Sequence, residues 1–126
     1  MRRGGISAGF MLLTLACGIG GCSGTFRANV ANQSAHPVRV ELVTTTVFGG
    51  TRVLGSERLA PGDAAVIGPV QGSRRWGRLF AYPEGIAAPR ASVDIGAGET
   101  TAHVVGVSLP QGVPGVDVRI VERNPN

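Results

Sequence analysis

The sequence predicts an all-β protein, an antiparallel β-sandwich of about seven to eight short strands that follows a separate N-terminal segment. Beyond residue 26, apolar and polar residues alternate and β-branched residues are frequent, as in half-buried strands. Glycine (20 residues) and proline (8 residues) interrupt these runs about every 8–12 residues. No stretch has a helical period. Two facing sheets would bury their apolar faces against each other, and a small β-barrel is the alternative.

The first 21 residues have the organisation of a secretion signal. Arg2 and Arg3 are followed by a run, 6–16, that is free of charge and apolar apart from one serine and one threonine. The run is too short to span a bilayer, which needs about 20 apolar residues. It suits the apolar part of a signal peptide, which measures roughly 7–15 residues.

The end of this segment, Ile19-Gly20-Gly21-Cys22, resembles the lipobox of bacterial lipoproteins. The resemblance implies that a signal peptidase cuts between Gly21 and Cys22 and that a diacylglycerol is attached to the sulfur of Cys22. Cys17 is the alternative site. It is preceded by a polar residue at −3 (Thr14), where the lipobox has an aliphatic one, and by a bulky residue at −2 (Leu15), where the lipobox has a small one. Cys22 is therefore favoured.

The predicted domain boundaries follow from this cleavage site. Residues 1–21 are the signal peptide, 22–25 are the lipidated cysteine and a short tether, 26–123 form the β domain and 124–126 are a tail. Fully extended, the tether reaches on the order of 10–15 Å. Lipoprotein cysteines carry at least two acyl chains, enough for stable anchoring. We therefore expect a lipid-anchored protein of the cell envelope, in the outer membrane if the cell has two membranes.

The mature chain has a small net charge and no cysteine available for a disulfide bond. Cys17 leaves with the signal and Cys22 is lipidated, and no other cysteine is present. All 12 basic residues are arginines, so the loss of Arg2 and Arg3 leaves ten against eight acids, a net charge of +2. This charge is too small to indicate nucleic-acid binding.

Eight strands are expected along the domain, each ended by a turn that contains glycine, proline or a polar residue. They are 26–34, 37–48, 51–59, 64–70, 76–82, 90–95, 101–109 and 116–122. The turn after the third strand, "LAPGD" at 59–63, resembles turns of bacterial immunoglobulin-like domains. The resemblance implies an immunoglobulin-like sandwich.

The mature sequence offers no set of catalytic or metal-binding residues. His36 lies in a predicted turn and His103 in a predicted strand, without the close spacing of metal ligands. The serines lack the Gly-x-Ser-x-Gly context of a nucleophile, and the acids are scattered singly. We therefore expect no enzyme activity, no cofactor and no metal.

The segment "SRRWGRLFAY" at 73–82 is the one candidate binding cluster. Its alternation places Trp76, Arg78, Phe80 and Tyr82 on one face of a strand. The bulky face is favoured as core, because large aromatic residues dominate small cores. The alternative turns Leu79 and Ala81 inward and leaves an arginine–aromatic surface outside. The candidate binding residues are Arg74, Arg75, Trp76, Arg78 and Tyr82.

These observations favour a non-enzymatic, membrane-anchored envelope lipoprotein with a structural or protein-interaction role at the membrane surface. The alternative is a module that binds carbohydrate or peptidoglycan through Trp76, Arg78 and Tyr82, since exposed aromatic rings stack on sugars and arginines anchor partners.

Overall fold

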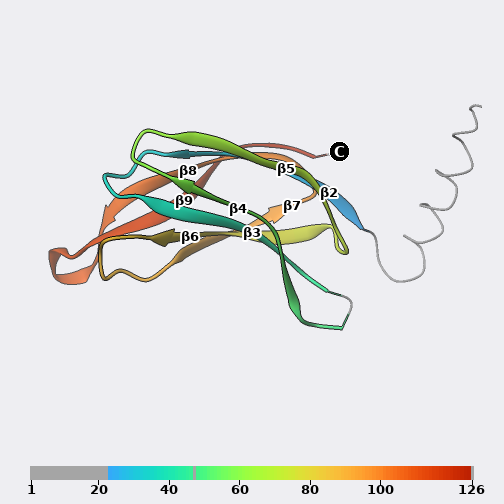
Figure 1. Cartoon of the computed structure of the whole chain (residues 1–126), viewed down its shortest axis with the longest axis horizontal. Coiled ribbons are helices and arrows are strands. Elements are labelled where there is room, and N and C mark those ends of the chain that lie inside the picture. The colour runs from blue at the N-terminus through green and yellow to red at the C-terminus, as the bar shows by residue number, and fades with distance from the viewer. Residues whose placement is uncertain (1–22, 47, 126) are drawn as a thin grey trace, which may run out of the picture.

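A computed structural model describes residues 23–46 and 48–125. The predicted signal segment, with Cys17, Gly21 and Cys22, lies outside the described residues. The strands, in chain order (Figure 1), are β2 (Gly24–Asn32), β3 (Val38–Thr45), β4 (Thr51–Leu59), β5 (Ala64–Gly72), β6 (Trp76–Pro83), β7 (Ala91–Gly96), β8 (Gly98–Ser108) and β9 (Pro114–Asn124). The only helical element in the described ranges is a single 3-10 turn at Pro110–Gly112.

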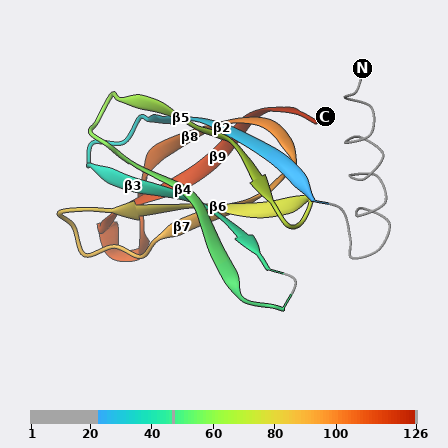
Figure 2. The ribbon, with the colours of Figure 1, turned by 45° about the vertical axis from the view of Figure 1, so that its right-hand side comes forward.

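The eight strands form two four-stranded sheets, which confirms the predicted β-sandwich. One sheet has the order β5-β2-β8-β9 and the other β4-β3-β6-β7. Figure 2 shows the two sheets as layers that face each other. All neighbouring strands are antiparallel except β2 and β8, which run parallel from Phe26 beside Gly98 to Asn32 beside Val104. In an immunoglobulin domain the second and third strands lie in different sheets, whereas here β3 and β4 are direct neighbours.

The core lies between the two sheets and consists of the side chains that face the opposite sheet. On β2 and β3 the alternation is complete: every second residue from Gly24 to Asn32 and from Val38 to Thr44 is buried. The largest fully buried side chains are Phe26, Leu42 and Leu79. Phe26 fits because two glycines face its ring, Gly72 and Gly77, where an added Cβ would lie 3.0 and 3.6 Å from ring atoms.

The prediction that the aromatic face of β6 forms the core is wrong. Leu79 and Ala81 are fully buried, whereas Trp76 is 59% exposed. Leu79 pairs with Leu42 and Ala81 with Val40 of β3, so the small apolar residues continue the buried face of the neighbouring strand. This arrangement keeps the Arg78 guanidinium in solvent and so avoids the cost of burying an unpaired charge.

The chain enters the sandwich earlier than the sequence predicts. Gly24 and Thr25, expected in the tether, already pair with Gly72 and Gln71 of β5. Ser23 is also held, because the side-chain amide of Gln71 donates a hydrogen bond to its hydroxyl (3.1 Å). At the other terminus β9 continues to Asn124. Because β2 begins at Gly24, only Ser23 separates position 22 from the first strand.

Several turns gather at the end of the sandwich where β2 begins, which we call the N-terminal end. Gly24 lies against Ala97 and the backbone of Arg74 and Arg75. The hydroxyl of Ser73 in turn donates to the carbonyl of Thr45 (3.0 Å), at the base of the β3–β4 hairpin. Figures 1 and 2 both show this hairpin and the start of β2 at the same end of the molecule.

Candidate functional site

The outer surface of the β4-β3-β6-β7 sheet carries most of the residues singled out from the sequence. Strand β6 presents Trp76, Arg78, Phe80 and Tyr82 on this surface, because Leu79 and Ala81 point into the core. Arg78 lies opposite Asp94 of β7 in the strand register. Its Nε donates to the Asp94 carboxylate at 2.8 Å, and both side chains are more than half exposed. Exposed ion pairs of this kind contribute little to stability, about 0.2–1 kcal/mol, so the pair remains available to a ligand.

A shallow groove of about 360 Å³ lies beside this ion pair. Its walls are Trp76, Arg78, Phe80 and Asp94, with the hydroxyl-bearing Thr45 and Thr51 on the side of the β3–β4 hairpin. The volume is at the lower end of the range for small-ligand pockets, about 300–1,000 Å³. The groove therefore combines one exposed indole, one charged pair and two hydroxyl groups.

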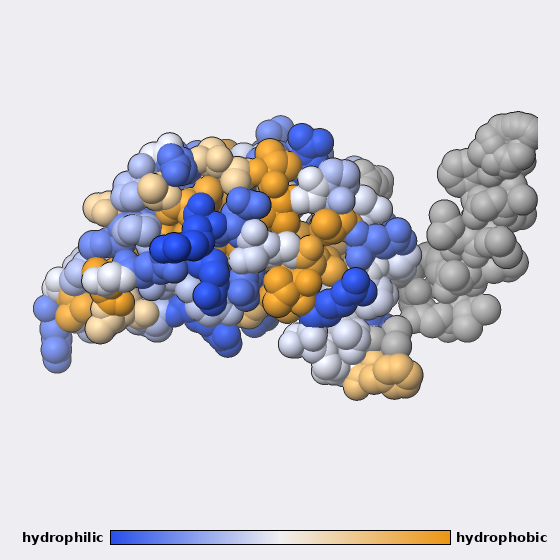
Figure 3. All heavy atoms as spheres, viewed as in Figure 1, coloured by the Kyte–Doolittle hydropathy of each residue, from blue (hydrophilic) through white to orange (hydrophobic). Residues whose placement is uncertain are grey.

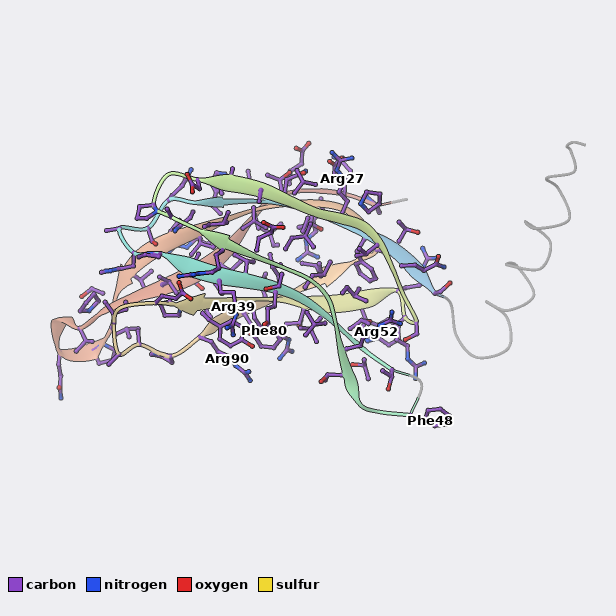
Figure 4. The ribbon with its side chains drawn as sticks, viewed as in Figure 1. Arg27, Arg39, Phe48, Arg52, Phe80 and Arg90 are labelled. Atoms are coloured by element: carbon purple, nitrogen blue, oxygen red, sulfur yellow. The ribbon has the colours of Figure 1, made fainter. Side chains whose placement is uncertain are left out.

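Farther along β6, two aromatic rings and two arginines form a row that we call the arginine–aromatic row. Phe80 and Tyr82 stack with their centroids 6.0 Å apart. The Arg39 guanidinium lies 4.6 Å from the Tyr82 centroid, and that of Arg90 lies 4.5 Å from the Phe80 centroid. Figure 4 labels Arg39, Phe80 and Arg90, which come from β3, β6 and the loop before β7.

The row changes what its rings can bind. Each ring already has a guanidinium over one face, and the two rings stack on each other, which leaves little ring surface for a sugar. Arg39 is further held by Glu41, with 3.4 Å between Nε and the carboxylate. A surface of arginines supported by aromatic rings is instead typical of protein interfaces, where tyrosine, tryptophan and arginine are enriched among the energetically dominant residues.

The five predicted binding residues therefore divide into three places. Trp76 and Arg78 line the groove, whereas Tyr82 belongs to the arginine–aromatic row. Arg74 and Arg75 lie in the turn between β5 and β6, at the N-terminal end. The carbonyl of Arg75 accepts a hydrogen bond from the amide of Ala97 (2.8 Å), which fixes this turn.

Three residues of this surface were missed by the sequence analysis: Arg39, Arg90 and Asp94. Each comes from another strand or loop and reaches β6 only through the strand order. The alternation of β3 placed Arg39 on an outward face, but no local signal showed that this face lies beside Tyr82.

The two histidines do not form a site among the described residues. His36 lies in the turn between β2 and β3, where its carbonyl accepts hydrogen bonds from the side chains of Asn32 and Ser34. His103 is on the outer surface of the other sheet, between Ala31 and Arg119 in the strand register. Neither imidazole makes a hydrogen bond or ion pair to another described residue, and no group of three potential metal-ligating side chains occurs in the described part of the chain.

Comparisons with protein-family models and with curated proteins find no match for this chain. Within residues 23–46 and 48–125, no helix has the length and apolar character needed to cross a bilayer.

Proposed function

We propose that this protein is a lipid-anchored, non-enzymatic component of the bacterial cell envelope, which binds another envelope protein through its arginine–aromatic row. The proposal combines the lipobox-like Ile19–Cys22 with the start of β2 at Gly24. With Cys22 lipidated, a single residue would join the anchor to the sandwich. Such a short connection holds a domain at the membrane surface, as expected of a protein that supports an assembly there.

The lipidation is tested by metabolic labelling with a fatty-acid analogue and by intact mass. The wild type is compared with Cys22→Ser and with the matched control Cys17→Ser. We expect the wild type and Cys17→Ser to take up label and to stay in membranes after a high-salt wash, and Cys22→Ser to lose both properties. Label that persists in Cys22→Ser, or release of the wild type by salt alone, would contradict the proposal.

The interaction role is supported by the chemistry of the row. The guanidinium groups of Arg39 and Arg90 lie within 5 Å of ring centroids, so their positions are restricted before a partner binds. Preorganised side chains lose less conformational entropy on binding. A planar guanidinium also donates bidentate hydrogen bonds to a carboxylate. A partner with exposed carboxylates and an apolar contact residue fits this surface.

A photo-crosslinking amino acid in intact cells tests this surface. We expect an adduct with an envelope protein when the crosslinker replaces Ser92, which lies beside Phe80 in the register and is exposed. The same crosslinker at Arg119, exposed on β9 in the other sheet, is the control. The adduct should decrease strongly in Arg39→Glu/Arg90→Glu. Equal adducts at both positions, unaffected by the charge reversal, would contradict the assignment of this surface.

A second candidate function, glycan binding, is supported by the groove beside Trp76. The indole is 59% exposed, and within the described residues no cation or ring stacks on it. Exposed tryptophan with neighbouring charged and hydroxyl groups suits stacking on a sugar ring with hydrogen bonds at its edge.

Purified peptidoglycan pull-down separates the two functions. The glycan hypothesis predicts that Trp76→Ala loses binding with an unchanged far-UV circular dichroism spectrum. Phe48→Ala, which removes another exposed aromatic ring outside the groove, should bind as the wild type does. If peptidoglycan retains no more of the wild type than of Trp76→Ala, this groove does not bind glycan.

A further inference from the structure

The most exposed large apolar side chain among those described is Phe48, at 96% relative exposure. It lies at the tip of the β3–β4 hairpin, which Figure 4 shows extending from the body of the sandwich. Hydrogen bonds join residues on either side of the tip, from the Thr46 amide to the Gly50 carbonyl (2.8 Å) and from the Gly49 amide to the Thr46 carbonyl (3.1 Å). Gly49 has a φ of +88°, a conformation that favours glycine. Figure 3, drawn in the same view, shows an apolar projection beside residues of intermediate hydropathy at the tip of this hairpin.

Three arginines with no acidic partner surround the same end of the molecule. Arg52 follows the hairpin tip on β4, and Figure 4 shows it on the same arm as Phe48. Arg74 and Arg75 lie in the β5–β6 turn, against Gly24 at the start of β2. The ion pairs of the described residues involve Arg27, Arg39, Arg58, Arg78 and Arg119, so these three have no neutralising partner there.

We propose that this end of the sandwich is a bilayer-docking surface, with Phe48 inserted at the headgroup–acyl boundary and Arg52, Arg74 and Arg75 against anionic lipid phosphates. The proposal rests on the proposed lipidation of Cys22, because the anchor would bring this end to the membrane. An exposed aromatic side chain gains from entering the interface, where aromatic residues are enriched. Basic residues near the surface are attracted to anionic lipids.

The occupant is assigned to a bilayer on the position and the charge of the surface. Position 22 precedes Gly24 by two residues, and Gly24 contacts Arg74 and Arg75. Any acyl chain on Cys22 would therefore enter the bilayer close to the turn that carries these two arginines. The unneutralised positive charge is complementary to phosphate headgroups and is concentrated where the chain enters the fold.

Docking at this end determines how the rest of the molecule is presented. The two sheets extend away from the N-terminal end, toward the turns that follow β2, β4, β6 and β8 (Figure 1). The bilayer would contact the hairpin tip and leave the arginine–aromatic row on the side of the domain. The envelope partner proposed above would then approach parallel to the membrane.

Lipid quenching of a single tryptophan tests the docking. Trp76, the only tryptophan of the chain, is replaced by phenylalanine, and a new tryptophan is introduced by Phe48→Trp. The matched control introduces it by Ala87→Trp, in the exposed loop before β7 at the opposite end. The lipidated mature protein, verified by intact mass, is reconstituted in vesicles of phosphatidylethanolamine and phosphatidylglycerol with brominated acyl chains.

Brominated lipid is expected to quench the tryptophan at position 48 several-fold more than the one at position 87, with emission shifted to shorter wavelength. Arg52→Glu/Arg74→Glu should reduce the difference at least about two-fold, whereas Arg58→Glu/Arg119→Glu, which changes the net charge equally, should not. Equal quenching at both positions overturns the docking while the lipidated mass leaves the proposed anchor intact. A mass without lipid on Cys22 overturns both. A crosslink from position 48 to an envelope protein, without lipid quenching, assigns this end to a protein partner and overturns the docking.

Discussion

The side chain of Asn32, at the end of β2, provides the most quantitative test of the structure. The residue is 1% exposed. Its amide nitrogen donates to the carbonyls of His36 (2.8 Å) and Leu59 (3.0 Å), and its oxygen accepts from the amide and the hydroxyl of Ser34 (3.0 and 2.6 Å). One polar side chain thus joins β2, the β2–β3 turn and the end of β4.

The substitution Asn32→Ala leaves two groups without partners. The Ser34 hydroxyl can still donate to the His36 carbonyl (2.9 Å), so those two groups remain satisfied. The Leu59 carbonyl and the Ser34 amide lose their hydrogen bonds to Asn32. A buried group left unsatisfied costs about 1–3 kcal/mol, so with two such groups we expect the free energy of unfolding to decrease by roughly 2–6 kcal/mol. This is a large share of the stability of a domain of this size, about 5–15 kcal/mol.

Urea unfolding followed by far-UV circular dichroism measures this effect. With an m-value of about 1.5 kcal/mol/M, the midpoint should decrease by about 1.3–4 M. Asn29→Ala is the matched control, because the Asn29 amide is only partly buried and donates to Glu99 and Thr101 on the outer surface, where water can replace it. The control should lose less than about 1 kcal/mol, as surface hydrogen-bond changes usually do. Equal midpoints for the two variants would refute the description of Asn32 as a buried cross-link.

Two further predictions test the orientation of β6. Leu79→Ala should lower the free energy of unfolding by about 2–5 kcal/mol, because Leu79 is fully buried and its truncation leaves a cavity; in urea unfolding, a loss as small as that of an exposed-residue variant would place this side chain outside the core. Gly77→Ala should destabilise by about 1–3 kcal/mol, because the added Cβ would lie 2.8 Å from the Val43 carbonyl oxygen and force β3 and β6 apart. The control is Ser92→Ala at an exposed position of β7. Gly85→Ala is not a suitable control, because the φ of +81° at Gly85 strains any side chain. An unfolding midpoint for Gly77→Ala equal to that of Ser92→Ala would contradict the close approach of β3 and β6.

The strands themselves were determined by the sequence. All eight expected strands are present, because alternation with a period of two and turn residues such as Gly49-Gly50 act between near neighbours. The same local pattern identified the apolar face of β2 and β3 without knowledge of their partners. It also predicted that no long helix forms in the domain, and the only helical element of the described residues is the 3-10 turn at Pro110–Gly112.

Local pattern could not determine which face of β6 is buried. Both faces of β6 carry apolar residues, and the larger ones favoured the wrong face. The choice depends on the neighbouring strand and the opposite sheet: Leu79 and Ala81 match Leu42 and Val40 of β3, while Phe26 fills the space left by Gly77.

The parallel pairing of β2 with β8 has the same origin as the position of Arg74 near the β3–β4 hairpin that carries Phe48 and Arg52. Phe48 and Arg52 belong to one hairpin, but Arg74 and the paired strands β2 and β8 are distant along the chain and meet their neighbours only through the order of strands in the two sheets. The sequence determines strands because their period is local, whereas surfaces arise from contacts between distant segments and are decided by the tertiary fold.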